Sequence, residues 1–328
     1  MKIALVGLGS VGRGVAEMVD KKELGITITA VADSKSSCMD SGGIDIPALL
    51  ARKKKTGLCG DTSITGADII KKATYDALVE VSPTNALTGE PSIKYIRATL
   101  GRKKHVVTSN KGPVSLAGKE LRALARKKGV AFRYEATVAG AIPVMHLLEH
   151  GLSGNEILSI SGVLNGTCNY ILTRMADEGL TYDQALLEAR EMGYAEADPT
   201  YDVQGIDAAI KLVILTNTIW DTGKKLDDVE RTGIDLLTAD ALRLAEEEGC
   251  TIRLIAESCP KTHVLRVSPR ILSKNHPLVV EGTLNALTLT TDMAKEITLI
   301  GRGAGSVETA SAIIGDLLYI RDHYARRA

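Results

Sequence analysis

The chain has 328 residues, enough for two domains with substantial cores. Its Lys and Arg residues number 40, as do its Asp and Glu residues, so no excess of charge indicates nucleic acid or an anionic membrane as a partner. A hydrophobic content of 45% is typical of a soluble globular protein, and the single Phe and single Trp argue against a stacking surface for single-stranded nucleic acid.

The N-terminus and the cysteines predict where the protein works. No apolar run is long enough to span a bilayer, and Met1 leads directly into a strand instead of a signal peptide. The cysteines are scattered and lack CxxC spacing, so we expect reduced thiols and no metal site built on sulfur. We therefore predict a cytoplasmic protein. The cysteines are Cys38, Cys59, Cys168, Cys250 and Cys259.

The N-terminal segment carries the pattern of a dinucleotide-binding turn. An apolar strand over residues 2–8 runs into a glycine-rich turn and a helix through about Val19, and a second strand over residues 26–32 ends at Asp33. This order of strand, glycine turn, helix, strand and acid is the one that dinucleotide-binding folds use. The predicted cofactor-binding residues of the turn are Gly7, Leu8, Gly9, Ser10, Val11 and Gly12.

The residue types of this turn each have a physical task. The three glycines permit a tight turn, a close approach of the backbone to the pyrophosphate, and close packing of helix on strand, while the helix N-terminus attracts the phosphates. Asp33 would accept a hydrogen bond from the ribose 2′-hydroxyl, which favours NAD. Lys35 and the basic run over residues 52–55 could instead receive the 2′-phosphate of NADP, although such a run is also typical of a solvated helix end. The sequence predicts NAD or NADP as cofactor.

Further along, two strands open into polar loops. A strand over residues 77–81 leads to Ser82 and Thr84, and a strand over residues 105–108 leads to Lys111. Ligands of doubly wound sheets lie beyond the carboxyl ends of strands, so we predict that Ser82 and Thr84 face the nicotinamide half of the cofactor. Lys111 is placed to meet a substrate carboxylate or a cofactor phosphate; the alternative is a turn lysine in solvent.

The alternation of strands and helices continues through a helix over residues 115–128 and a strand over residues 130–134. It predicts a parallel sheet with right-handed crossovers, that is, a Rossmann-type doubly wound nucleotide-binding domain over residues 1–134. Residues 301–328 contain a second glycine-rich helix start, with a helix over residues 307–323. We expect this segment to return to the nucleotide-binding domain; a plain C-terminal cap on the second domain is the alternative.

After residue 134 the pattern changes to that of an α+β domain, which we place at residues 135–300. A loop of small residues over 135–143 is followed by a strand over 157–164. Helices are expected over residues 165–175 and 181–192. The later segments are rich in β-forming residues and predict an antiparallel-leaning sheet; they span residues 263–271, 278–291 and 297–300.

The chemistry is expected to be concentrated in residues 193–215. Asp207 and Lys211 lie four residues apart, on one face of a helix whose other residues are almost all apolar. Such a pair is most often a solvated surface pair. A surface helix would not surround Lys211 with branched aliphatic residues, however, and a lysine is rarely buried without a partner or a task. The preceding loop adds Glu196, Asp198 and Asp202.

Several separate motifs resemble the homoserine dehydrogenase family over nearly the whole chain. They are GLGSVG, SPTN, SNKGP, EATVAGAIP, GVLNGTCNYIL, GYAEADPTYDVQGIDAAIKL and GRGAGSVETAS. The resemblance implies an enzyme that oxidises L-homoserine to L-aspartate 4-semialdehyde with NAD(P), or runs the reverse reaction, on the route to threonine, methionine and isoleucine.

The resemblance also implies roles for individual residues. Lys211 resembles the catalytic lysine, which gives a proton to the semialdehyde oxygen or takes one from the alcohol. Glu196 and Asp207 resemble the groups that hold the ammonium of the substrate and orient its hydroxyl group, and Asp202 is expected to assist. Lys111 matches a lysine that contacts both cofactor and substrate.

A sodium ion and a homodimer are further implications of the resemblance. The expected ligands of the ion, largely through backbone carbonyls, are Glu135, Val138, Gly140 and Ile142, and Gly305 is expected to line the cofactor site. Many relatives carry glycine where this chain has Ala139 and Ala141, which narrows the conformational freedom of the loop. A C-terminal regulatory domain is not expected. For the predicted dimer, a closed monomeric sheet is the alternative.

Two other functions are compatible with parts of this pattern. The first is an amino-acid dehydrogenase of the same architecture with a different substrate, because the acids near Lys211 fit any small amino acid. The second is a regulatory protein that senses NAD(P) without turnover. A buried lysine with acids around it argues against the sensor, which has no reason to keep such a group.

Overall fold

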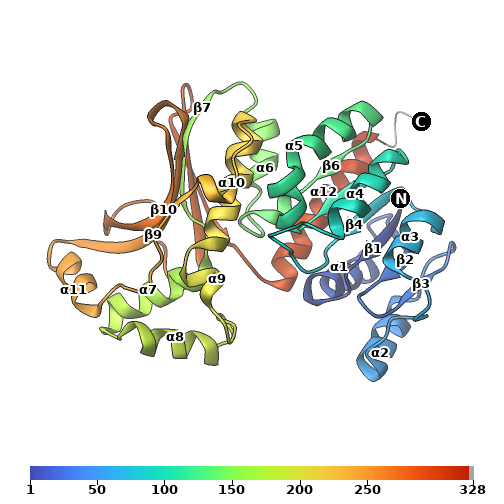
Figure 1. Ribbon diagram of the computed structural model, residues 1–328, viewed down its shortest axis with the longest axis horizontal. Helices are drawn as coiled ribbons and strands as arrows, with labels where there is room; N and C mark the ends of the chain where they lie inside the picture. The colour runs from blue at the N-terminus through green and yellow to red at the C-terminus, as the bar shows by residue number, and fades with distance from the viewer. Residues whose placement is uncertain (325–328) are drawn as a thin grey trace. The chain divides into compact units, whose positions relative to one another are not determined.

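The computed structural model describes residues 1–324, which fold into two compact units, each with its own sheet (Figure 1). The first unit consists of Met1–Gly140 and the segment from Gly305 onward, and the second of Ala141–Ala304. The end of the segment that the sequence predicts to return, residues 325–328, lies outside the described residues.

The sheet of the first unit has the strand order β3-β2-β1-β4-β5-β6. β1 pairs in parallel with β2 and β4, and β4, β5 and β6 follow in parallel, whereas the edge strand β3 pairs with β2 in the antiparallel sense. The predicted Rossmann-type sheet is confirmed. The elements are β1 (Lys2–Val6), α1 (Ser10–Lys21), β2 (Thr27–Ala32), β3 (Ser37–Met39), α2 (Ile46–Thr56), α3 (Gly66–Lys72), β4 (Ala77–Glu80), α4 (Ser92–Gly101), β5 (His105–Thr108), α5 (Lys111–Lys128), β6 (Phe132–Arg133), η1 (Glu135–Thr137) and α12 (Ser306–Tyr324).

The core of this unit explains why its strands are continuous apolar runs. A parallel sheet is covered on both faces, so consecutive residues of β1, such as Ile3, Ala4 and Leu5, are all fully buried. The core cluster also includes residues of α1, α2 and α12. α12 packs beside α1, and Ser306 Oγ donates to the carbonyl oxygen of Ser10 at 2.6 Å (Figure 1).

The strand order reverses between β1 and β4, which places the polar loops after these strands at one edge of the sheet. In open α/β sheets this switch point is where ligands bind. One predicted boundary nearby is wrong: α5 begins at Lys111 and not at residue 115, because Asn110 caps it by accepting a hydrogen bond from Gly112 N at 3.1 Å. Lys111 is therefore a first-turn helical residue.

The sheet of the second unit has the order β12-β11-β7-β9-β10-β8, with antiparallel pairs except for the parallel pair β8–β10. Helices α7 and α10 both contact β9. The elements are α6 (Val144–His146), η2 (Leu147–Gly151), β7 (Ile157–Val163), α7 (Gly166–Glu178), α8 (Tyr182–Glu191), α9 (Thr200–Val203), α10 (Ile206–Trp220), η3 (Leu226–Asp228), β8 (Glu230–Arg231), α11 (Ala239–Glu247), β9 (Cys250–Cys259), η4 (Pro260–Thr262), β10 (Val264–Ser273), β11 (Leu284–Thr291) and β12 (Glu296–Arg302).

The antiparallel-leaning sheet is confirmed, but the short strand β8 was not predicted, and two longer segments differ from the sequence prediction. The strand expected over residues 278–291 begins only at Leu284. The long strand β9 was not predicted, because its sequence interrupts the apolar residues with Arg253, whose guanidinium is buried against Thr251 Oγ1 and the carbonyl oxygen of Ile252, both at 2.9 Å. Among the described residues, no helix is both long enough and apolar enough to cross a membrane.

Candidate active site

The turn between β1 and α1 has the geometry that a bound dinucleotide requires. Gly7 has a φ of +106°, and a Cβ there would come within 2.5 Å of the Val81 carbonyl oxygen. A Cβ at Gly12 would lie 1.9 Å from the carbonyl oxygen of Gly7. At Gly9, by contrast, a Cβ would meet no atom of the described residues within 4 Å, so this part of the turn is open to a ligand. The turn fits the pyrophosphate of NAD(P).

The first turn of α1 fits the same group. No side chain of the described residues caps this helix end and its first turn has no acid, so its N–H groups can receive an anion. Ser10 is exposed, Val11 is half-buried and Leu8 is buried in the core. Gly305, with a φ of +126°, directly precedes the residue of α12 that bonds to Ser10, so the C-terminal glycine-rich segment lies against this turn.

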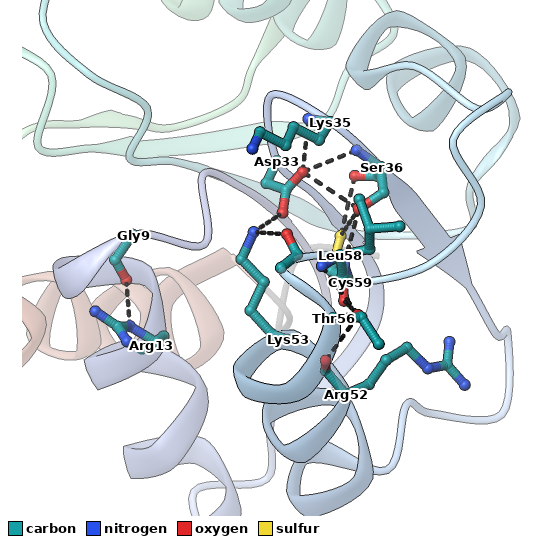
Figure 2. Close-up of polar contacts among 11 residues, drawn as sticks. Gly9, Arg13, Asp33, Lys35, Ser36, Arg52, Lys53, Thr56, Leu58 and Cys59 are labelled. Carbon is teal, nitrogen blue, oxygen red and sulfur yellow. Dashed lines mark hydrogen bonds and ion pairs between the residues drawn. The ribbon is translucent and has the colours of Figure 1, made fainter.

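Asp33 follows β2 and is already paired with a cation (Figure 2). Its Oδ2 lies 2.5 Å from Nζ of Lys53 on α2, and its Oδ1 accepts hydrogen bonds from the backbone N–H groups of Lys35 and Ser36 at 2.7 and 2.8 Å. Burial acts to raise the pKa of Asp33, but these hydrogen bonds outweigh it and hold that pKa below its ordinary value of 3.8. Sequence reasoning identified the basic run but not which of its residues meets the acid.

At the end of β4 lies a buried carboxyl group that sequence reasoning missed. Glu80 is 0% exposed and accepts hydrogen bonds from Ser82 N at 3.1 Å, Ser92 Oγ at 3.1 Å and Thr108 Oγ1 at 3.2 Å, as well as from Ser82 Oγ. Burial raises the pKa of Glu80 above its ordinary value of 4.5, and these hydrogen bonds offset only part of that effect. Nothing in the sequence around Glu80, at the end of an apolar strand, indicates that this carboxyl group is buried and accepts these hydrogen bonds.

The loops after β4 and β5 are tied together. Asn110, 2% exposed, donates to the carbonyl oxygen of Ser82 at 3.3 Å and to Ser92 Oγ at 3.0 Å while it caps α5. Ser82 and Lys111 are half-buried, and Thr84 is exposed. The structure therefore brings Ser82 and the helix start at Lys111 to one network, whereas Thr84 lies outside it.

In the second unit, Lys211 and Asp207 are buried on α10, with 6% and 5% exposure. The Nζ of Lys211 lies 2.8 Å from Asp207 Oδ2 and donates to the carbonyl oxygen of Leu164 at 2.6 Å. These are its two polar partners within the described residues, and an ammonium has three N–H donors. The solvated-pair interpretation is wrong. α10 is buried on all sides from Asp207 to Asn217 because its residues are apolar almost all round.

Asn165 and Asp202 complete what we call the lysine–carboxylate cluster: Asn165, Asp202, Asp207 and Lys211. Asn165 Nδ2 donates to Asp202 Oδ1 at 2.7 Å and to Asp207 Oδ2 at 2.9 Å. Asp202 is half-buried on α9. Sequence reasoning missed Asn165. An Asn before a helix is a capping signal, but its acidic partners lie 37 and 42 residues away in the chain.

Glu196 is not brought into this cluster. It is exposed, and it makes no hydrogen bond or ion pair with the described residues. Its loop is held on either side of it: Thr167 Oγ1 donates to the carbonyl oxygen of Tyr194 at 2.7 Å, and Arg190 donates to that of Ala197 at 3.1 Å. The side chain of Glu196 is thus available to a ligand from solvent.

The residues expected to hold sodium lie in a buried loop. Glu135 and Val138 are 2% and 0% exposed, and Ile142, at the start of the second unit, is 3% exposed. Ala139 and Gly140 both have a positive φ, of 58° and 56°, so an alanine stands where glycine would be unstrained. No group of three or more His, Cys, Asp or Glu side chains among residues 1–324 could hold a metal, but the expected ligands here are backbone carbonyls.

Comparison with known proteins gives one consistent family. A family model described as homoserine dehydrogenase matches residues 143–318, and one described as homoserine dehydrogenase, NAD binding domain, matches residues 7–135. The homoserine dehydrogenase of Methanocaldococcus jannaschii is 45% identical over 98% of each chain.

Two solved structures agree in fold. A crystal structure from Archaeoglobus fulgidus that bears a provisional homoserine dehydrogenase name has a TM-score of 0.92 and 48% identity, over 98% of this chain and 99% of that one. A hyperthermophilic archaeal homoserine dehydrogenase in complex with NADPH has a TM-score of 0.83 and 29% identity, over 97% of both chains. The chain therefore belongs to the homoserine dehydrogenase family of NAD(P)-dependent oxidoreductases.

Proposed function

We propose that the chain catalyses the reversible NAD(P)-dependent oxidation of L-homoserine to L-aspartate 4-semialdehyde, a step in the biosynthesis of threonine, methionine and isoleucine. The observation that carries the proposal is the buried amino group of Lys211, which has one donor position left beyond its two partners in the described residues. A general acid or base must have such a position to reach the reacting oxygen.

In this proposal the first unit binds the cofactor, which takes up or gives back the hydride, and the second unit binds the amino acid. During oxidation Lys211 takes the proton of the hydroxyl group as the carbon loses its hydride. During reduction it returns a proton to the carbonyl oxygen. Asp207, 2.8 Å from Nζ of Lys211, helps to hold the substrate and to orient its hydroxyl group. Asp202 and Glu196 hold the amino group of the substrate, and Lys111 holds its carboxylate or a cofactor phosphate.

A substrate panel tests the proposal. Nicotinamide absorbance is followed with L-homoserine and with other small amino acids, each with NAD and with NADP. We expect turnover with homoserine and at least 10-fold lower kcat/KM for the others. Higher turnover with another amino acid would identify that amino acid as the substrate in place of homoserine. Tight cofactor binding without any turnover would indicate a regulatory protein that senses NAD(P).

For the cofactor, we propose that the chain accepts both NAD and NADP. The pair of Asp33 and Lys53 supports this (Figure 2). Asp33 can accept a hydrogen bond from a ribose 2′-hydroxyl, and Lys53, whose side chain is 24% exposed, can turn from Asp33 to a 2′-phosphate. Lys53→Met should lower kcat/KM for NADP by about 10- to 100-fold and leave NAD within a few-fold, because one charge-assisted hydrogen bond contributes about 1.5–3 kcal/mol. Equal effects on both cofactors would contradict the proposal.

A sodium ion is proposed at Glu135, Val138, Gly140 and Ile142. Support comes from their burial and from the positive φ of two consecutive residues in the loop, 58° at Ala139 and 56° at Gly140, which turns the chain sharply there. Replacing sodium chloride by choline chloride at constant ionic strength should lower activity and thermal stability together. An unchanged rate and an unchanged melting temperature would contradict the proposed sodium site.

We also propose a cytoplasmic homodimer formed through the sheet of the second unit. Ser161, Thr288 and Thr298 are direct cross-strand neighbours on one face of β7, β11 and β12. Ser161 and Thr298 are partly buried, and Thr288 between them is 7% exposed. Ile300, on the same face, is 55% exposed. Thr298→Arg should convert a dimer to a monomer in light scattering. All five cysteines are free, which is consistent with a reducing compartment.

A further inference from the structure

Asn165, a member of the lysine–carboxylate cluster, lies at the junction between β7 and α7. It is 4% exposed, and its Oδ1 accepts the hydrogen bond of Cys168 N at 2.8 Å, which caps α7. This bond fixes the orientation of the amide: since the oxygen faces the helix, the NH₂ group must face the other way. A capping asparagine needs only its oxygen, so the NH₂ group is free for a second task.

The NH₂ group connects two acids that come from different helices. One N–H donates to Asp202 on α9 at 2.7 Å and the other to Asp207 on α10 at 2.9 Å, so both donors of the amide are used. Two carboxylates on one small group repel each other, and a neutral double donor between them offsets that repulsion without adding charge.

The same junction also holds the lysine. Nζ of Lys211 donates to the carbonyl oxygen of Leu164, the residue before Asn165, at 2.6 Å. Asp207 Oδ2 therefore receives both Lys211 and Asn165, at 2.8 and 2.9 Å. Two consecutive residues thus fix three charged groups of α9 and α10, the first through its carbonyl group and the second through its amide.

We propose that Asn165 is a positioning residue of the reaction: it sets the spacing of Asp202 and Asp207 and thereby aims the amino group of Lys211 at the reacting oxygen. This inference rests on the proposed role of Lys211. A small displacement of an acid–base group from its reactive position is costly in rate, so the effect should appear in kcat. Cofactor binding, which the proposal places in the other unit, should not change.

Two substitutions separate the capping role from the positioning role. Asn165→Ser keeps a capping oxygen but removes both amide N–H donors and leaves a shorter side chain with one hydroxyl donor. Asn165→Asp keeps the cap and the shape but places a third acid against Asp202 and Asp207. Within the described part of the chain, Lys211 on α10 and the Cys168 thiol on α7 are further titratable groups close to this position, and burial raises the pKa of that thiol well above its ordinary value. At low pH the introduced carboxyl group can hold a proton and donate one hydrogen bond; as the pH rises it loses that proton and repels both acids.

The experiment measures kcat and KM for homoserine against pH, with cofactor affinity and melting temperature, for both Asn165 variants, Lys211→Met and Thr181→Ala. Thr181→Ala is the control: it removes the exposed cap of α8, where Thr181 Oγ1 accepts a hydrogen bond from Gln184 N. This variant should have a lower melting temperature and an unchanged kcat. We expect Asn165→Ser to lower kcat by about 10- to 100-fold at every pH. The kcat of Asn165→Asp should equal that of Asn165→Ser at low pH and should fall a further 10-fold or more as the pH rises.

The outcomes distinguish this inference from the proposed function. If Lys211→Met is inactive while both Asn165 variants keep kcat and the wild-type pH profile, the positioning role is wrong and the lysine role stands. If Asn165 variants lose only melting temperature, as Thr181→Ala does, Asn165 is a cap and nothing more. If Lys211→Met keeps wild-type turnover, the lysine role itself fails, and the positioning role fails with it.

Discussion

Two buried carboxyl groups, Glu80 in the first unit and Asp207 in the second, have opposite surroundings. Glu80 is fully buried among three hydroxyl groups and one backbone N–H, and no cationic side chain of the described residues pairs with it. Asp207 has the ammonium of Lys211 at 2.8 Å and the amide of Asn165 at 2.9 Å. Glu80 is the last residue of β4 and Asp207 the second residue of α10, so each lies next to a loop of a candidate ligand site.

The difference shows that burial alone does not identify a group that moves protons. The partners of Glu80 come from the loop after β4, from α4 and from β5, so the group holds three segments together with neutral donors. Asp207 is instead paired with Lys211, the group that gives or takes the proton in the proposed reaction. Breaking each arrangement should therefore affect different quantities: the rate at Asp207, and the free energy of unfolding at Glu80.

The largest effect is expected from Lys211, the cationic partner that distinguishes Asp207 from Glu80. Lys211→Met and Lys211→Arg should both lower kcat by about 10²–10⁴-fold, the usual contribution of a general acid or base, with cofactor affinity unchanged. The arginine variant keeps a cation beside Asp207 but cannot release its proton. Steady-state kinetics and a cofactor titration measure both, and an arginine variant with more than a tenth of the wild-type kcat would contradict the role.

Glu80→Ala should act on stability instead. It leaves the N–H of Ser82 and the hydroxyl groups of Ser82 and Ser92 without the carboxylate acceptor and opens a cavity, which should cost about 2–4 kcal/mol of the free energy of unfolding. The hydroxyl group of Thr108 keeps the backbone carbonyl oxygen of residue 80, at 2.8 Å. Urea unfolding followed by circular dichroism measures this. A loss below about 1 kcal/mol would show that the hydroxyl groups find other partners.

Glu80→Gln should change how stability depends on pH. The pKa of Glu80 is raised in the folded state, so the folded protein binds more protons than the unfolded chain once the pH exceeds 4.5, and wild-type stability is lost as the pH rises from there through the folded-state pKa. Gln cannot titrate, so the variant should gain on the wild type by about 1.4 kcal/mol for each pH unit between the two pKa values. Urea unfolding at pH 5 and pH 8 measures the difference in the free energy of unfolding between the variant and the wild type. If this difference does not change with pH, the pKa of Glu80 is not raised by folding.

The smallest effect is expected at an exposed ion pair of the first unit, which gives a reference for the two buried groups. Arg97 contacts Glu120 through two hydrogen bonds of 2.8 and 3.1 Å, but both side chains are about half exposed. The pKa of Glu120 is held below its ordinary value by Arg97. Solvent screening limits such pairs, so Arg97→Gln should cost only about 0.2–1 kcal/mol in the same unfolding experiment. A larger loss would mean that exposure does not separate these classes of carboxylate.

The elements that sequence alone predicted well are those with a local signal. The glycine turn at residues 7–12, the acid at residue 33 and the apolar helix with Asp207 and Lys211 are all encoded within a few tens of residues. The predicted start of α5 at residue 115 was wrong because Asn110 caps the helix, whereas the sequence pattern assigned Asn110 to the loop after the preceding strand. The sequence analysis did not predict β9 because the buried Arg253 interrupts its apolar pattern.

The sequence by itself determined the fold class, the family resemblance and the suspicion that Lys211 is buried, because periodicity and glycine spacing are local properties of the chain. Only the tertiary structure decided which groups meet: Lys53 with Asp33, Glu80 with the hydroxyl groups of two neighbouring segments, and Asn165 with two acids. Those contacts join residues separated by 12 to 42 positions. Hydrogen-bond partners at such separations are set by how helices and strands pack, and no local pattern in the chain records them.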